Sequence, residues 1–333
     1  MLLPEPCGPL TIALVVALGR GEPVLLPDVA APLDPLADDD LQLALWICYE
    51  LHYRGFDDVA DSWEWQPDLI ALRGQLEQRT LTALRQAVDV SVGDAPVAEQ
   101  LRELVENDDG PGLSRFVQRQ ASRAQFDEFA IHRSIYQLKE ADPHTWAIPR
   151  LSGRAKAALL EIQFDEYGGA DPARMHSELY RRLLRGLGLQ DCYGAYVNAV
   201  PGITLAISNV MSMFALRREL RGALVGHLAA YEMTSSAPCR RYAKGLRRLG
   251  GDDRTCEFYD VHVTADALHE QLAAHDLCGG LAEAEPDLAR DIVFGAAVCL
   301  YVDRRFAEHV FGCWKRDRSS LRERVGPSLA RVS

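Results

Sequence analysis

The chain has 333 residues, of which 48% are hydrophobic and 25% charged, and its formal net charge is −12. This composition is typical of a globular protein with one large domain or two of ordinary size. The excess of acidic residues argues against nucleic acid or an anionic membrane surface as the main partner.

The cysteines and the apolar segments indicate a cytoplasmic protein. None of the eight cysteines forms a CxxC pair, which argues against a zinc ribbon or a thioredoxin-like site. Several stand in apolar runs such as "AAVCLYV", where a reduced cysteine packs as a small hydrophobic residue. The segment "PLTIALVVAL" lacks the basic residues that precede a signal sequence, so we expect a short buried helix there. No segment approaches the ~20 apolar residues that a membrane span needs.

Apolar residues recur at helical spacing along most of the chain, which predicts an all-α protein. A proline-containing extended segment is expected at 23–38, between the first helix and a second one at 41–55. A third predicted helix covers 68–88. A boundary near 107–112 divides a helical N-terminal extension, residues 1–110, from a main helical bundle, residues 111–333.

Helix-breaking residues end several of the predicted bundle helices. The helix at 126–141 is closed by Pro143, and the helix at 152–169 opens at Ser152 as its N-cap. The next helix is expected to begin with Asp171 as N-cap and Pro172 at the first helical position. The remaining predicted helices cover 217–236, 257–275 and 287–314.

The segment "FYDVHVTADALHEQ" carries a pattern that suits a metal ion. His262, Asp266 and His269 stand at positions i, i+4 and i+7, which share one face of a helix. Two imidazoles and one carboxylate are suitable ligands for a transition metal. A solvated polar face would show the same spacing, so further ligands are needed to decide.

Candidate ligands lie on four other helical segments. Glu232 is the most informative, because it follows the apolar run "ALVGHLAAY" and a buried unpaired charge is very costly. Near Glu166, the neighbouring Glu161 and Asp165 are rival ligands. A di-iron carboxylate centre in a helical bundle requires such acids together with histidines from facing helices. The four candidates are Glu140, Glu166, His176 and Glu232.

These seven residues, in this order, resemble those of the haem-oxygenase-like di-iron oxidases and oxygenases, also described as iron-containing redox enzymes. The blocks "YELHYRGF", "DEYGG…RMH" and "FYDVHVTADALHE" carry the likeness, which covers residues 40–315. The resemblance implies a haem-oxygenase-like helical bundle. It also implies two irons that cycle between Fe2+ and Fe3+, O2 as co-substrate and an external electron donor.

The resemblance further implies roles for the individual residues. Glu140, His176 and His269 would mainly hold one iron, whereas Glu232, His262 and Asp266 would mainly hold the other. Glu166 would add or bridge as an extra carboxylate, and Glu166 and Glu232 are the expected catalytic carboxylates.

The expected activity is O2-dependent chemistry on a small molecule. The ligand set with Glu166 resembles that of amine-oxygenating members, which favours N-oxygenation in a natural-product pathway. Oxidative C–C cleavage or desaturation is the close rival. A metal-free helical binding protein and a haem-degrading enzyme are further alternatives, and a homodimer and a reductase partner are compatible with the sequence.

Several other polar residues have simpler interpretations. His132 and His227 are expected to be structural. Arg133, Arg150 and Arg154 are candidate partners of a substrate carboxylate, although surface roles are commoner for arginine.

Overall fold

The computed structural model describes residues 1–21 and 32–322, and for residues 264–268 it describes the backbone alone. Within these ranges the chain forms helices and turns and no strand, which confirms the all-α class. Residues 22–31 of the extended segment expected at 23–38 lie outside the described part. Among the described residues, no helix combines the length and the apolar character that a membrane crossing requires.

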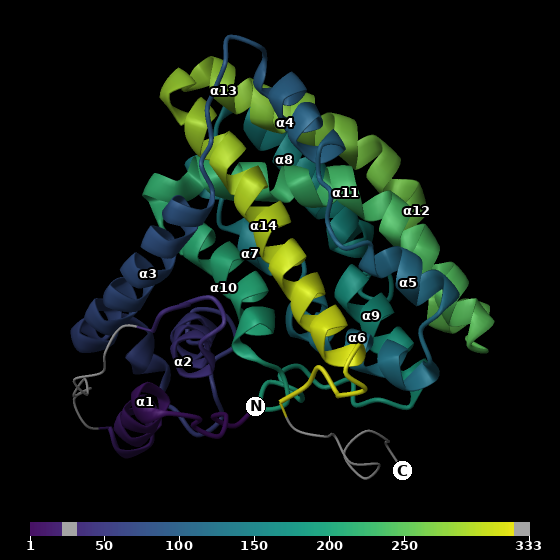
Figure 1. Ribbon diagram of the computed structural model, residues 1–333. Coiled ribbons are helices and arrows are strands. Elements are labelled where there is room, and N and C mark those ends of the chain that lie inside the picture. Colours follow the sequence, from purple (N-terminus) through teal and green to yellow (C-terminus); the bar gives the residue numbers. More distant parts are fainter. Residues whose placement is uncertain (22–31, 323–333) are drawn as a thin grey trace.

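The N-terminal helices pack directly on the later ones (Figure 1). The side chains of α2 are buried on nearly all sides, and this helix packs against α1, α3 and α10. Asp38 caps α2 by accepting a hydrogen bond from the Leu41 N–H at 2.8 Å. A fully buried ion pair joins Glu50 of α2 to Lys139, the residue before Glu140. The helices of this part are α1 (Pro9–Arg20), α2 (Asp39–Glu50), α3 (Pro67–Ala87), α4 (Val97–Glu106) and α5 (Leu113–Arg119).

The main bundle is built around α11, which packs against α12 on one side and α14 on another (Figure 1). The π-helix at Leu272–Gly279 follows α12 and packs against α8. The longer helices of the bundle are α6 (Arg123–Gln137), α8 (Gly153–Glu166), α9 (His176–Leu187), α10 (Gly202–Leu216), α11 (Arg221–Arg248), α12 (Asp253–Gln271) and α14 (Ala289–Trp314). Two short helices, α7 (Asp142–Thr145) and α13 (Gly280–Ala284), connect them.

Two glycines allow α11 and α14 to touch through their backbones. A Cβ atom on Gly226 would lie 1.8 Å from the Ile292 carbonyl oxygen. A Cβ atom on Gly295 would lie 1.9 Å from the Ala223 carbonyl oxygen. Any side chain at either position would therefore force the two longest helices of the bundle apart.

Three helical predictions need correction. The helix expected from Asp171 begins at His176, because the Asp171 carboxylate accepts the Ala173 N–H and closes a separate turn. The helix expected at 217–236 extends to Arg248 and contains Pro238. Helix α10 was not predicted, and nearly all of its residues are buried, including the polar Thr204, Ser208 and Ser212.

Candidate metal centre

A tight turn brings Glu166 and His176 together. Glu166 is the last residue of α8 and His176 is the first of α9. Between them Gly168 adopts φ +70°, and a Cβ there would lie 2.5 Å from the Met175 backbone nitrogen. Only glycine combines this left-handed conformation with so close an approach of the two chain segments. The "DEYGG" block thus positions two of the candidate ligands.

Four buried side chains form the first group, which consists of Glu140, Glu166, His176 and His262. Each offers one potential ligand atom, and these atoms all lie within 4.8 Å of one another. The His176 Nδ1 atom lies 2.9 Å from Glu166 Oε2, and the His262 Nε2 atom lies 3.5 Å from Glu140 Oε1. The two imidazole rings are 4.3 Å apart between centroids. Glu140 lies in the turn after α6 rather than inside that helix.

Glu166 also belongs to a second group with Glu232 and His269, again with potential ligand atoms within 4.8 Å of one another. The His269 Nδ1 atom lies 3.3 Å from Glu232 Oε2. The side chain of Asp266 lies outside the described residues, so its predicted role stays a prediction. The two groups share Glu166, the carboxylate expected to bridge.

The grouping of the histidines differs from the split that the resemblance implied. His262 lies with Glu140 and His176, whereas His269 lies with Glu232. One helical stripe on α12 therefore serves both groups, with its first histidine in one and its last in the other. Helical spacing fixes the shared face but does not determine which histidine faces which carboxylate.

Hydrogen bonds at the far side of each α12 ring orient these histidines. The Phe258 carbonyl lies 2.7 Å from His262 Nδ1, and a carbonyl accepts only, so this nitrogen carries the proton. Asp165 Oδ2 lies 3.1 Å from His269 Nε2 and orients that ring in the same way. In both rings the remaining nitrogen then faces the cluster, where it can bind a metal ion once it carries no proton, as metal-ligating histidines do. Asp165, expected as a rival ligand, instead contacts the far nitrogen of a candidate ligand.

The donor set fits a metal ion. Glu166 Oε2, His176 Nδ1 and His269 Nδ1 are buried and lack a hydrogen-bond partner with acceptable geometry among the described residues. Buried polar atoms are rarely left in this state, and here they face other carboxylate and imidazole atoms. Ligands aimed at a common point between them would have this arrangement. Mixed carboxylate and imidazole ligands suit iron.

The electrostatics of the cluster are strongly coupled. Burial opposes ionisation of the Glu166 carboxyl, but His176, followed by His262 and His269, outweighs it and lowers its pKa to about 2. Burial likewise opposes protonation of His269, but the Glu232 and Asp165 carboxylates outweigh it and raise its pKa to about 9. In the absence of metal, the proton on the His269 imidazole therefore balances part of the carboxylate charge.

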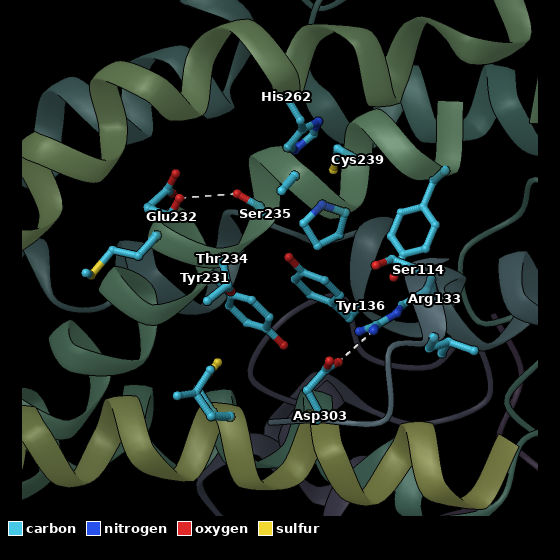
Figure 2. Close-up of a pocket in the computed structure, with 18 of the residues that line it drawn as sticks. Ser114, Arg133, Tyr136, Tyr231, Glu232, Thr234, Ser235, Cys239, His262 and Asp303 are labelled. Atoms are coloured by element: carbon cyan, nitrogen blue, oxygen red, sulfur yellow. Dashed lines mark hydrogen bonds and ion pairs between the residues drawn. The ribbon is translucent and has the colours of Figure 1, made fainter. Parts of the chain in front are cut away.

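A cavity of about 660 Å³ opens onto the cluster (Figure 2). Glu232 of α11 and His262 of α12 lie at one side of it, and Tyr136 and Tyr231 line its middle. The Tyr136 hydroxyl donates to Glu140 Oε1 at 2.9 Å, and its ring stacks on Tyr231 with centroids 5.3 Å apart. Tyr136 was not among the predicted site residues, although it stands four residues before Glu140. The loop at 107–112, expected as a domain boundary, forms part of the cavity rim.

The remaining candidates lie apart from the cluster or have structural partners. His132 is buried between the Thr204 and Ser320 hydroxyls, as a structural histidine would be. Arg150 donates to the carbonyls of Ala215 and Leu216. Arg154 pairs with Asp276 and Glu283. The His227 ring contacts the Tyr231 ring edge to face and lies tilted against the His144 ring.

Comparison with known proteins identifies the family of the chain. The family described as iron-containing redox enzyme matches residues 127–304, more than half of the chain, and that range includes every candidate ligand. The chain belongs to this family, and its class is that of the oxidoreductases.

A curated relative is the nitrosourea synthase of Streptomyces achromogenes subsp. streptozoticus, which is 27% identical over 150 residues. The matched region is 45% of this chain and 32% of that enzyme. The chain thus matches about a third of the length of this relative.

Proposed function

We propose that the protein is an O2-dependent non-haem di-iron oxygenase that acts on a small molecule and transfers oxygen to an amine nitrogen. The sharing of Glu166 between two buried acid–histidine groups at the floor of a cavity carries the proposal. Glu140, His176 and His262 would hold one iron. Glu232 and His269 would hold the other, with Asp266 as a further ligand.

Two irons at this site would supply the activation of O2, which the side chains alone cannot perform. The residues of the chain supply the ligand field, the orientation of the imidazoles and the exclusion of water by an apolar bundle. Glu166 and Glu232, the proposed catalytic carboxylates, belong to the cluster and also line the cavity, as Glu140 does. The overall reaction would consume O2, two electrons from an external donor and two protons, and release water with the oxygenated amine.

The choice of N-oxygenation rests on two observations. The first is the extra carboxylate Glu166, shared between the groups. The second is the relative named nitrosourea synthase, because a nitrosourea carries oxygen bound to nitrogen. Oxidative C–C cleavage or desaturation would use the same centre, and product analysis distinguishes them.

The test begins with anaerobic reconstitution with Fe(II), followed by elemental analysis and measurement of O2 consumption. We expect two irons per chain, loss of both from Glu166→Ala, and wild-type content in Glu161→Ala, an exposed acid on the same helix. Reaction with 18O2 and a panel of amines should place the label on nitrogen. A wild-type protein that binds no iron and consumes no O2 would instead support the metal-free binding protein.

A further inference from the structure

An ion pair on the α14 side of the cavity takes no part in the candidate metal centre. Arg133 of α6 donates from Nη2 to Asp303 Oδ1 of α14 at 2.6 Å, and both residues line the cavity. Figure 2 shows this pair on the α14 side, with Tyr136 and Tyr231 drawn between it and His262. The pair and the metal centre therefore face the same cavity from different sides.

The Arg133 guanidinium is held in a fixed orientation. Its side chain is 11% exposed, and its central carbon lies 4.8 Å from the Phe306 ring centroid and 5.6 Å from that of Phe129. A guanidinium has N–H donors on several edges, and Asp303 and the Tyr242 hydroxyl occupy some of them. A rigid, desolvated guanidinium with donors directed into a cavity is well suited to bind a carboxylate.

Asp303 differs from Arg133 in being 44% exposed. Its carboxylate can thus accept hydrogen bonds from a molecule in the cavity while it keeps its bond to Arg133. The two residues present opposite charges side by side on one wall. Arg150 and Arg154, the other arginines considered as carboxylate partners, bond to backbone carbonyls or to acids outside this cavity.

We propose that the Arg133–Asp303 pair binds a zwitterionic head group, such as the carboxylate and ammonium of an α-amino acid. The carboxylate would bind Arg133 and the ammonium would bind Asp303. A lone carboxylate at Arg133 would be repelled by Asp303, and a lone ammonium at Asp303 would be repelled by Arg133. A zwitterion instead gives each wall charge an opposite partner and leaves none uncompensated.

This head-group site adds a substrate class to the proposed function. The orientation of the substrate towards the metal cluster rests on that function. Arg133 and Tyr136 lie on α6, Glu140 lies in the turn that follows this helix, and all three residues line the cavity. A molecule bound by its head at Arg133 can therefore extend past Tyr136 towards the metal cluster. The reacting nitrogen would lie at the far end of the side chain, away from the head group.

Three probes with the same hydrocarbon chain separate the charges. L-norleucine carries both head-group charges, hexanoate lacks the ammonium, and pentylamine lacks the carboxylate. Calorimetric titration of the full chain should show norleucine binding at least about tenfold more tightly than either analogue. Arg133→Gln should weaken norleucine binding about tenfold. Asp303→Asn, at a half-exposed residue, should abolish the preference for norleucine over hexanoate.

An Arg–Asp pair that lies away from the cavity provides the control. Arg305 pairs with Asp34 at 2.5 Å and lies over the Tyr301 ring, but neither member of the pair lines the cavity. Arg305→Gln should leave norleucine affinity unchanged. If Arg133→Gln lowers the melting temperature and leaves probe selectivity intact, the pair is only a clamp between helices and the proposal is overturned.

Two further outcomes would also overturn the head-group site. One is hexanoate binding as tightly as norleucine. The other is the absence of saturable norleucine binding at about 10 mM. The titrations are run on metal-free and iron-loaded protein, and iron content is measured separately. If the protein binds norleucine selectively but holds no iron, the head-group site is supported and the di-iron oxygenase is rejected. If the protein holds iron but does not bind norleucine selectively, only the head-group site is rejected.

Discussion

Replacement of Asp165 should weaken one of the two iron sites and leave the other intact. Its Oδ2 atom lies 3.1 Å from His269 Nε2, while His269 Nδ1 faces Glu232 at 3.3 Å. The hydrogen bond to Asp165 keeps the proton on Nε2 and holds the ring with Nδ1 towards the cluster. Asp165→Ala removes this acceptor, so the ring is free to rotate and to change tautomer.

The magnitude follows from the position of Asp165. Loss of such an acceptor behind a metal-bound histidine typically weakens metal binding by about 10- to 100-fold. The Asp165 side chain is 49% exposed, so water can take over part of the hydrogen bond. We therefore expect the lower end, about tenfold or about 1.4 kcal/mol of binding free energy. Asp165→Asn keeps an acceptor oxygen and should cost less.

The assay is an anaerobic Fe(II) titration with a competing chelator, followed by iron analysis after gel filtration. The site of Glu140, His176 and His262 should retain its affinity, and the second iron should be lost first. Glu161→Ala, four residues earlier on α8, is the matched control because Glu161 is exposed and outside both groups. If Asp165→Ala keeps both irons at wild-type affinity, the proposed orientation of His269 is wrong.

Three further predictions follow from the described contacts. Gly226→Ala should lower the free energy of unfolding by about 3 kcal/mol, because its Cβ would overlap the α14 backbone, whereas Gly74→Ala, with no atom within 4 Å, should raise it by up to about 1 kcal/mol. Burial lowers the pKa of His144 to about 4, so at this residue the unfolded state binds more protons between pH 4 and 6.5. His144 should therefore account for about 3 kcal/mol of the stability that metal-free protein loses as the pH falls through that window. Denaturation at several pH values should show a loss smaller by about that amount for His144→Leu. Tyr136→Phe removes the hydrogen bond to Glu140 and should weaken Fe(II) binding at that site about tenfold, and equal affinities would contradict a role for the hydroxyl.

The helical class and much of the candidate site were predictable from local patterns. The spacing of His262 and His269 places both on one face of α12, and both rings do face the cluster. Glu232 was singled out because an isolated acid in an apolar helix needs a partner, and it lies 3.3 Å from His269. Such inferences succeed because helical periodicity and the cost of a buried charge are local properties.

Features that depend on tertiary packing could not be read from the sequence. The partition of the histidines between the two groups depends on how α12 lies against the turn after α6, which no spacing encodes. The start of α9 was predicted too early because Asp171 and Pro172 satisfy the rules for a helix start but close a separate turn. From the sequence, a surface role was the commoner expectation for Arg133. In the structure it pairs with Asp303 of α14, a contact that depends on how the helices pack.

The glycine contact between α11 and α14 has a consequence for how substrate range can evolve. Glu232 lies six residues beyond Gly226 on α11, and Asp303 lies eight residues beyond Gly295 on α14. The glycine contact therefore fixes the positions of these two cavity residues relative to each other. Sliding or spreading these helices to admit a longer molecule would break that contact. Adaptation to new compounds should therefore proceed through exchange of lining side chains or remodelling of the rim loop, with the backbone frame left unaltered.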